Sequence, residues 1–480
     1  MFDYEFDDDA GDDGLEDLVA AYEHALAQGR TPFFDSDDLE NVATFYYEAG
    51  RFEDALGVVD RQLALYPASS DAWMRRGVLL NHLDRNEDAL AAYDEALRFN
   101  PVDAETLINR GITLDTLGRS EEALADYEAA LAFDAALPEA HFNIGIACEK
   151  LERYEQATEA FAACLALDAE HPEAWYELGY CYDQLSRLEE ALHAYDKQID
   201  LDPFAQNAWY NRGIVLNRLG RFQEAVDSYD FATAIEEGFA SAWYNRGNAL
   251  ANLGDPRGAI ESYLTVLEYE DGDAATYYNL GIAYDELGEH ETAVDYFRRA
   301  VEEEDDYADA WYGLGCALDA LGRTADALRA FGRAIALDPD ESEYWHARAD
   351  TEYNAGRLGE ALLSYAHVVR LDPDNADAWF DLAETRMQAG QKAAALDAFS
   401  HVLRLDPDSS EAYLKQAIAL ADLGQRESAA RSLRRAAELD PTRSDEIRRA
   451  FSELWGEART GGASGSGGTT GGAAGTADEW

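Results

Sequence analysis

Alanine recurs every 34 residues along most of this chain, and that spacing constrains the fold more than any other feature of the sequence. Twelve consecutive units of 34 residues fill residues 36–443 without an insertion or a deletion. A fixed period of this length indicates small structural units, each of which packs against its neighbours. Position 20 of the twelve units holds Ala55, Ala89, Ala123, Ala157, Ala191, Ala225, Ala259, Ala293, Ala327, Ala361, Ala395 and Ala429.

Other positions of the unit are almost as regular. Position 8 is glycine or alanine in every unit, position 24 is aromatic in ten units, and position 15 is glycine in nine. Seven of the nine tryptophans stand at position 4, and seven of the eleven prolines stand at position 32. Small side chains at positions 8 and 20 allow two helices to approach closely, while bulky side chains at positions 4, 11 and 24 fill the surrounding space.

Each unit is therefore predicted to form a hairpin of two helices. Residues 208–220, AWYNRGIVLNRLG, are typical of a first helix, helix A, because the apolar side chains at positions 4, 7 or 8, and 11 share one face. Glycine at position 15 ends helix A. Helix B then presents the alanine at position 20 and the aromatic side chain at position 24, and proline at position 32 stops it.

The pattern resembles the tetratricopeptide repeat, whose signature is W-x2-L-G-x2-Y, then A-x3-F, then P. There are departures: Leu39, Leu107 and His141 replace tryptophan at position 4, and the last three units carry alanine at position 8. The resemblance covers residues 36–443 and implies an all-α, right-handed α-α superhelix, or solenoid, of about twelve repeats. It also implies a non-enzymatic scaffold or adaptor that binds a partner polypeptide in the concave groove.

The domain organisation follows from the repeat boundaries. One repeat cannot bury enough apolar surface to be stable alone, so the ends of a stack need capping helices. We predict an acidic disordered tail over 1–14, a capping helix and linker over 15–35, twelve repeats over 36–443, a second capping helix over 444–455 and a Gly-rich flexible tail over 456–480. The terminal Trp480 is either a docking motif or incidental. The acidic, aromatic start from Phe2 to Asp9 either folds into the chain's own groove or stays solvated.

Charge excludes several classes of partner. The chain has 97 acidic and 38 basic side chains, a formal net charge of −59, which argues against binding to nucleic acids and to anionic membranes. No uninterrupted apolar run approaches the 18 residues of a membrane span, and the start has no secretory signal. We therefore expect a cytoplasmic location.

The sequence also contains no recognisable catalytic or metal-binding motif. None of the nine histidines lies in HExxH, there is no GxxxxGK[ST] loop, and no two cysteines form CxxC. We expect no cofactor, no metal and no enzymatic activity. The four cysteines, Cys148, Cys164, Cys181 and Cys316, are interpreted as buried thiols, with redox sensing as the alternative.

The resemblance places positions 2, 5, 6, 9, 12 and 13 of helix A on the concave face. Position 6 is asparagine in five of the six units from the third to the eighth, with Glu177 as the exception. A row of amides offers donors and acceptors that can pair with the main chain of an extended peptide. The alternative is that these amides bond within the array. The five residues are Asn109, Asn143, Asn211, Asn245 and Asn279.

Two further rows belong to the candidate site. At position 5, Tyr210, Tyr244 and Tyr278 either contact a ligand or pack between repeats. At position 12, carboxylates favour a ligand with Lys or Arg, or form a plain solvated face: Asp115, Asp183, Asp285 and Asp319. Basic residues are almost absent from positions 2 and 6, unlike in relatives that clamp the acidic tails of chaperones. Position 6 then changes to Ala347, Asp381 and Lys415, which suggests a second surface.

Several functions remain open at this stage. The partner is expected to be another protein or an extended peptide segment. The alternatives to a scaffold are an acidic chaperone for basic proteins and a regulatory subunit of a partner enzyme. The identity of the partner, the pathway and the oligomeric state are left open by the sequence.

The acidity generates a first prediction. Only four of the 38 basic residues are lysine, and excess carboxylate with Arg over Lys resembles proteins from organisms with molar salt in the cytoplasm. At about 1 M salt the screening length falls to about 3 Å, which removes most of the self-repulsion of the compact state. We expect helicity, measured by circular dichroism, to fall on dialysis into low salt. Unchanged helicity in dilute buffer would contradict a halophilic origin.

Overall fold

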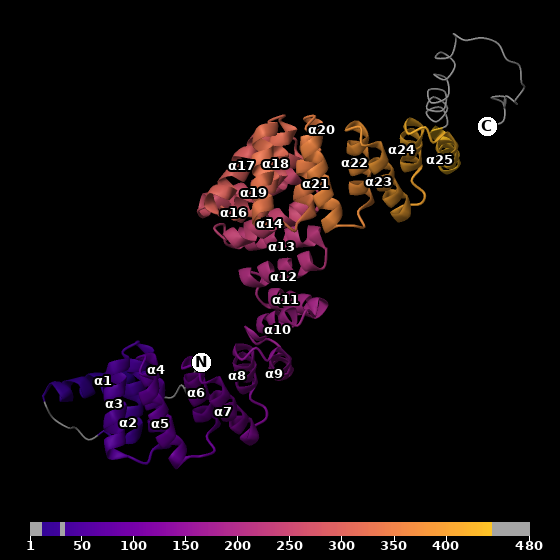
Figure 1. The fold of residues 1–480 in the computed structure, drawn as a ribbon. Coiled ribbons are helices and arrows are strands. Elements are labelled where there is room, and N and C mark those ends of the chain that lie inside the picture. Colours follow the sequence, from indigo (N-terminus) through magenta and orange to yellow (C-terminus); the bar gives the residue numbers. More distant parts are fainter. Residues whose placement is uncertain (1–11, 29–33, 444–480) are drawn as a thin grey trace, which may run out of the picture. The chain divides into compact units, whose positions relative to one another are not determined.

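The computed structural model describes residues 12–28 and 34–443, and within these residues the chain contains α-helices, one short 3-10 helix and no strand (Figure 1). The helices form two compact units, Met1–Leu253 and Gly254–Trp480, which divide the seventh repeat between its two helices. The predicted capping helix at 444–455, residues 1–11 of the predicted tail over 1–14, and the predicted tail over 456–480 lie outside the described residues.

The helices follow the predicted period. In the first unit they are α1 (Asp12–Ala27), α2 (Ser36–Glu48), α3 (Phe52–Leu65), α4 (Ser70–His82), α5 (Asn86–Phe99), α6 (Ala104–Thr116), α7 (Ser120–Phe133), α8 (Pro138–Lys150), α9 (Tyr154–Leu167), α10 (Ala174–Gln184), α11 (Leu188–Leu201), α12 (Gln206–Arg218), α13 (Phe222–Ile235) and α14 (Ala240–Asn252). In the second unit they are α15 (Pro256–Tyr269), α16 (Ala274–Glu286), α17 (His290–Glu303), α18 (Ala308–Ala320), α19 (Thr324–Leu337), α20 (Ser342–Asn354), α21 (Leu358–Leu371), α22 (Ala376–Gln388), α23 (Lys392–Leu405), α24 (Ser410–Asp422) and α25 (Arg426–Leu439), followed by the 3-10 helix η1 (Pro441–Arg443).

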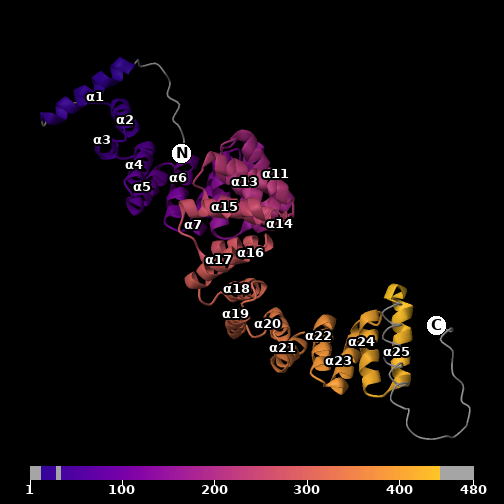
Figure 2. The ribbon, with the colours of Figure 1, turned by 90° about the horizontal axis from the view of Figure 1, so that it is seen from above.

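From α2 onward, even-numbered helices are helices A and odd-numbered helices are helices B. Within each unit a helix contacts the one before it and the one after it, and Figure 2 shows this succession from α22 to α25. The all-helical solenoid of paired helices is thus confirmed, with the first helix of the twelve pairs at Ser36 and the last helix ending at Leu439.

Position 15 ends helix A through a left-handed backbone conformation. Gly220 has φ 72°, and the N–H of Arg221 donates to the carbonyl of Leu216 at 2.9 Å, which closes the last turn of α12. The predicted role of this glycine is confirmed. In the three units without glycine, the residue at position 15 adopts the same conformation: Asp84, Glu152 and Ser186, with φ between 57° and 58°.

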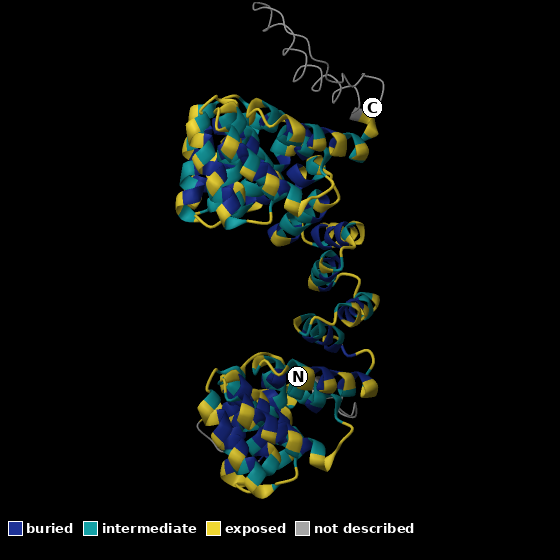
Figure 3. Cartoon of the chain, turned by 45° about the vertical axis from the view of Figure 1, so that its right-hand side comes forward, coloured by how far each residue is buried: buried dark blue, intermediate teal, exposed yellow. Residues whose placement is uncertain are grey.

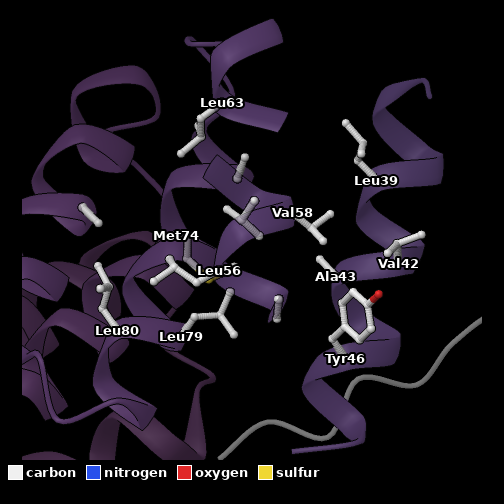
Figure 4. Close-up of a cluster of buried hydrophobic side chains, with 14 of the residues drawn as sticks. Leu39, Val42, Ala43, Tyr46, Leu56, Val58, Leu63, Met74, Leu79 and Leu80 are labelled. Atoms are coloured by element: carbon white, nitrogen blue, oxygen red, sulfur yellow. The ribbon is translucent and has the colours of Figure 1, made fainter. Parts of the chain in front are cut away.

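The core lies between the helices as a series of clusters of buried side chains along each unit. Every alanine at position 20 is fully buried, and Figure 3 shows the buried faces turned toward neighbouring helices. At the N-terminal end, Ala43 and Tyr46 of α2 lie on the side of that helix that faces Val58 of α3 (Figure 4). Helix α1 adds buried Val19 and Tyr22 to the same cluster.

The small residue at position 8 is required by the ring at position 24 of the same repeat. A Cβ atom added to Gly213 would lie 2.5 Å from Cε1 of the fully buried Tyr229, so the ring occupies the space that a side chain would need. The same close approach is found for Gly77 with Tyr93, Gly111 with Tyr127, Gly145 with Phe161, Gly179 with Tyr195, Gly281 with Phe297 and Gly315 with Phe331.

A tryptophan in seven repeats and an arginine in four repeats make a polar contact with the preceding repeat. The indole N–H of Trp209 donates to the carbonyl of Pro203, at 3.0 Å, and the other six tryptophans at position 4 make the same bond to position 32. Arg212 stacks over Trp209, 5.7 Å from the ring centre, and pairs with Asp196 of the preceding repeat at 2.7 Å. Arg76 with Asp60, Arg110 with Asp94 and Arg246 with Asp230 repeat this ion pair.

The packing of position 8 on position 24 predicts a specific mutational coupling. Gly213→Ala should lower the free energy of unfolding by about 1–3 kcal/mol, because the new methyl group overpacks against Tyr229. Repeats 10 and 11 combine alanine with an aromatic ring, so we expect the lower end of this range. The double variant Gly213→Ala/Tyr229→Leu copies Ala417 and Leu433 of repeat 12. Its free energy of unfolding should fall by less than the sum of the decreases in the two single variants.

The denaturant concentration at the midpoint of unfolding is measured by circular dichroism in high salt. Additive effects of the two substitutions, or an unchanged midpoint for Gly213→Ala, would show that the close approach does not limit this helix pair.

Candidate functional site

Helices A of neighbouring repeats contact one another directly. In the first unit α4, α6, α8, α10, α12 and α14 each contact the next in this series, and in the second unit α16 contacts α18, α18 contacts α20 and α22 contacts α24. We call positions 2, 5, 6, 9, 12 and 13 of helices A the inner face. Each of the two units has its own inner face.

Two of the predicted asparagines bond within the array. The Nδ2 atom of Asn211 donates to the hydroxyl of Tyr176, and that of Asn245 donates to the hydroxyl of Tyr210, both at 3.0 Å. Each bond joins position 6 to position 5 of the preceding repeat and leaves the amide oxygen for another donor. Asn279 lies half-buried on α16 at the equivalent place.

Asn109 and Asn143 differ because the residue at position 5 of the preceding repeat has no hydroxyl. Asn109 meets the sulfur of Met74, with 3.9 Å between Nδ2 and Sδ, which is a weak contact. Asn143 follows the repeat that holds Ile108 at position 5, and it makes no side-chain hydrogen bond with any described residue. Both asparagines are half-buried. Their amides therefore retain the most unused hydrogen-bonding capacity in the row.

The predicted tyrosines are half-buried and pack inside the array. The ring of Tyr210 lies 6.1 Å from that of Tyr229 and 4.8 Å from that of Phe239. The ring of Tyr278 likewise lies 5.9 Å from that of Phe297 and 5.0 Å from that of Tyr307. Burial raises the pKa of the hydroxyls of Tyr210 and Tyr278.

Tyr244 lies half-buried on α14. The ring contacts of Tyr210 and Tyr278 fit the packing interpretation, and contact of the tyrosine row with a ligand stays a prediction.

Three of the four predicted aspartates already have partners inside the protein. Asp115 is 8 % exposed and accepts a hydrogen bond from the hydroxyl of Tyr127 at 3.1 Å. Asp183 pairs with Arg218, and Asp285 lies 2.7 Å from Nδ1 of His290. Asp319 is half-buried on α18. This row is therefore less open to a basic ligand than its sequence suggests.

Glu177, the exception in the asparagine row, forms a carboxyl pair with Glu149 of the preceding repeat. Burial, followed by the negative charge of Glu149 and a hydrogen bond between the two groups, raises the pKa of Glu177 to about 8. Burial also raises the pKa of Glu149. Two neighbouring carboxylates with little access to water are most stable when they share a proton.

The inner face of repeats 10 and 11 carries a polar pocket that the sequence analysis missed. His346 stands at position 5, where repeats 5 to 9 have tyrosine, and its Nε2 atom lies 2.9 Å from Oδ2 of Asp381. The hydrogen bond to Asp381 raises the pKa of His346. An open pocket of about 250 Å³ lies here, lined by Asp350, Tyr353, Tyr365, Asp381, Glu384 and Thr385.

A buried charge marks the same repeat. Glu352 occupies position 11, a core position, and is fully buried; it bonds to Arg348 at 2.9 Å and to Ser364 at 2.7 Å. The sequence signal was present: position 6 changes at Ala347, and positions 5, 9 and 11 become polar in one repeat. The change at position 6 alone predicted a second surface but not the pocket.

The cysteines fit the interpretation as buried thiols. Cys148, Cys164 and Cys181 are buried, and Cys316 is half-buried. Burial raises the pKa of all four, to about 11 for Cys164 and for Cys316. Because the thiolate is the reactive form, these cysteines are poorly suited to redox sensing.

The chain belongs to the tetratricopeptide repeat family. A family model described as tetratricopeptide repeat matches residues 43–104, 149–205, 184–238 and 244–310, a second matches 286–350 and 353–417, and a third matches 410–443. A model described as TPR repeat matches residues 116–152. No curated protein matches the sequence significantly.

Solved structures of other repeat proteins are similar to parts of this chain. The peptide-binding TPR protein YrrB is 22 % identical, with a TM-score of 0.36, and the match covers 39 % of this chain and 96 % of that one. MamA is 27 % identical, with a TM-score of 0.33, covering 34 % and 94 %. The APC/C hetero-tetramer Cut9-Hcn1 is 15 % identical, with a TM-score of 0.41, covering 84 % and 92 %. Among the described residues no helix is long and apolar enough to cross a membrane.

The carboxyl pair predicts a pH-dependent stability. Because the pKa of Glu177 is raised in the folded state, folding takes up a proton between about pH 4.5 and pH 8, and stability from this group falls as the pH rises through that window. Glu177→Gln should make the stability depend less on pH and should raise the melting temperature measured above pH 8. Melting curves from pH 5 to pH 9 at constant salt measure the effect. The exposed Glu170, changed to Gln, is the control. An equal shift in both variants would contradict a shared proton.

Proposed function

We propose that this protein is a non-enzymatic scaffold whose inner face binds an extended segment of another protein. Members of its family are generally protein-interaction scaffolds, and the chain carries the family's repeats along most of its length. The proposal rests on the inner face of the first unit, where polar side chains recur at a fixed spacing from repeat to repeat.

The observation that carries the proposal is the unused amide capacity of Asn109 and Asn143. Both side chains are half-buried, so water reaches them in the free protein, and neither has a strong partner of its own. An amide presents a donor and an acceptor side by side, which matches the alternating C=O and N–H groups of an extended main chain. Such bonds read the backbone of a ligand and place few demands on its side chains.

The chaperone alternative depends on free carboxylates at position 12. Asp115, Asp183 and Asp285 are occupied by Tyr127, Arg218 and His290, so a basic ligand would have to break these contacts. A ligand recognised through its main-chain groups would leave these contacts intact. A regulatory subunit would use the same inner face, with an enzyme as the partner, and a change in the rate of a captured enzyme would identify it.

We also propose that the protein works in the cytoplasm of a cell with high internal salt. The net charge of −59 and the preference for Arg over Lys support this setting. At high salt, long-range attraction of a basic partner is screened, whereas short hydrogen bonds from buried amides persist. The proposed recognition mode therefore suits the proposed setting.

The asparagine site predicts a loss of peptide affinity without a loss of stability. Peptides selected from a random display library against the full chain in high salt should bind Asn109→Ala or Asn143→Ala about 2–10-fold more weakly, the effect of one hydrogen bond. Neither substitution removes a strong internal bond, so the melting temperature should change little. Binding is measured by fluorescence anisotropy.

Asn86→Ala is the matched control, because it removes the same amide from the first turn of helix B in α5. The site is wrong if selected peptides bind all three variants as tightly as the unaltered chain. It is also wrong if Asn86→Ala weakens binding as much as the inner-face variants do.

A further inference from the structure

A set of possible metal ligands that peptide recognition does not require lies beside the polar pocket of repeats 10 and 11, and two of its members, Asp350 and Asp381, line that pocket. His346 and Asp350 lie one turn apart on α20, and Asp381 lies on α22 of the next repeat. One ligand atom from each of the three side chains lies within 4.8 Å of the other two. Among the described residues this is the single group of three or more His, Cys, Asp or Glu side chains that meets this distance.

The distances fit a common ion. The Nε2 atom of His346 lies 2.9 Å from Oδ2 of Asp381 and 3.9 Å from Oδ1 of Asp350. Zn²⁺ binds imidazole nitrogen and carboxylate oxygen at about 2.0–2.2 Å, which separates two ligands of one ion by about 3–4 Å. Small side-chain rotations would therefore place all three atoms around a single centre. An ion there would replace the proton that His346 and Asp381 now share.

The pocket leaves room for the remaining coordination positions. The space of about 250 Å³ is lined by Asp350, Asp381 and Glu384 among other residues. Half of the Asp350 side chain, 51 %, is accessible, which provides an entry path. Three protein ligands with an open fourth position are the arrangement found where zinc binds a water molecule or an external ligand.

Neighbouring side chains orient the ligands. The hydroxyl of Tyr365 donates to Oδ1 of Asp350, and the Tyr365 ring packs edge-on against His346 with 5.8 Å between ring centres. Such outer contacts fix ligand geometry at metal sites.

Two cations of this region pair with other carboxylates. Arg348 pairs with the buried Glu352, and Lys415 pairs with Glu384, which also lines the pocket. Asp350 and Asp381 pair with His346 and with no described Lys or Arg, so their carboxylates can accept another cation.

We propose that His346, Asp350 and Asp381 bind one divalent transition-metal ion of the Zn²⁺ type. The imidazole favours Zn²⁺ and its neighbours in the first transition row over Mg²⁺ and Ca²⁺, which prefer oxygen ligands alone. The ion joins α20 to α22, because its ligands come from two successive repeats. Its open position faces the pocket and accepts water or a donor side chain of a partner.

The test uses the full chain, Zn²⁺ as the probe, and a large excess of Mg²⁺ in high salt to occupy weak carboxylate sites. Isothermal titration calorimetry should give one Zn²⁺ per chain, and Zn²⁺ should raise the melting temperature. Co²⁺ in place of Zn²⁺ should give visible absorption typical of four- or five-coordination. His346→Gln and Asp381→Asn should each weaken Zn²⁺ binding more than about 10-fold, and Tyr365→Phe about 10-fold.

The matched control is His290→Gln. His290 also lies against an aspartate, Asp285, at 2.7 Å, but belongs to no described group of three ligands. His290→Gln should leave Zn²⁺ binding unchanged. The proposal is overturned if the unaltered chain binds no stoichiometric Zn²⁺ above the Mg²⁺ background. It is also overturned if His290→Gln and His346→Gln lose Zn²⁺ equally. Circular dichroism of each variant shows that it is folded, and Tyr365→Phe keeps the three ligands in place.

Discussion

The structure depends on one contact that recurs inside seven of the repeats, between the glycine at position 8 of helix A and the ring at position 24 of helix B. In repeat 6 this contact is so close that Gly213 has no space for a methyl group beside Tyr229. The distance between the two helices sets where the tryptophan at position 4 meets the preceding loop and where the arginine at position 7 meets the preceding helix. Stacking of these repeats follows from a contact within each of them.

The same stacking creates a recurring place on the inner face where position 6 of one repeat meets position 5 of the repeat before it. In repeats 5 to 7 this place holds an amide bonded to a tyrosine hydroxyl, as in Asn211 with Tyr176. In repeats 10 and 11 it holds the carboxylate of Asp381 beside the imidazole of His346. One backbone geometry thus presents different chemistry along the array, because a change of two side chains changes which groups meet at this place.

The sequence was sufficient to predict what depends on one position at a time. The alanine at position 20 is buried because any larger side chain would separate the helices, and the residue at position 15 ends helix A whether or not it is glycine, as Glu152 demonstrates. The inner face depends on pairs of side chains about 35 residues apart. Asn211 is bonded and Asn143 is not, because the repeat before each one differs at position 5. Asp115 is turned toward Tyr127, which position 12 alone does not reveal.

Repeat 10 contains a core residue, Glu352, that lowers the stability of the repeat and lies next to the polar pocket. A carboxylate at a fully buried core position costs free energy even when it is well bonded, and Glu352 needs both Arg348 and Ser364 to stay there. In an isolated domain this cost would lower the stability of the whole fold. In a stacked array, contacts with the neighbouring repeats offset the cost in a single repeat. Arg348 pairs with Glu352, whereas Asp350 and Asp381 of the adjacent pocket pair with His346, so the buried core carboxylate and not a pocket carboxylate is the partner of this guanidinium.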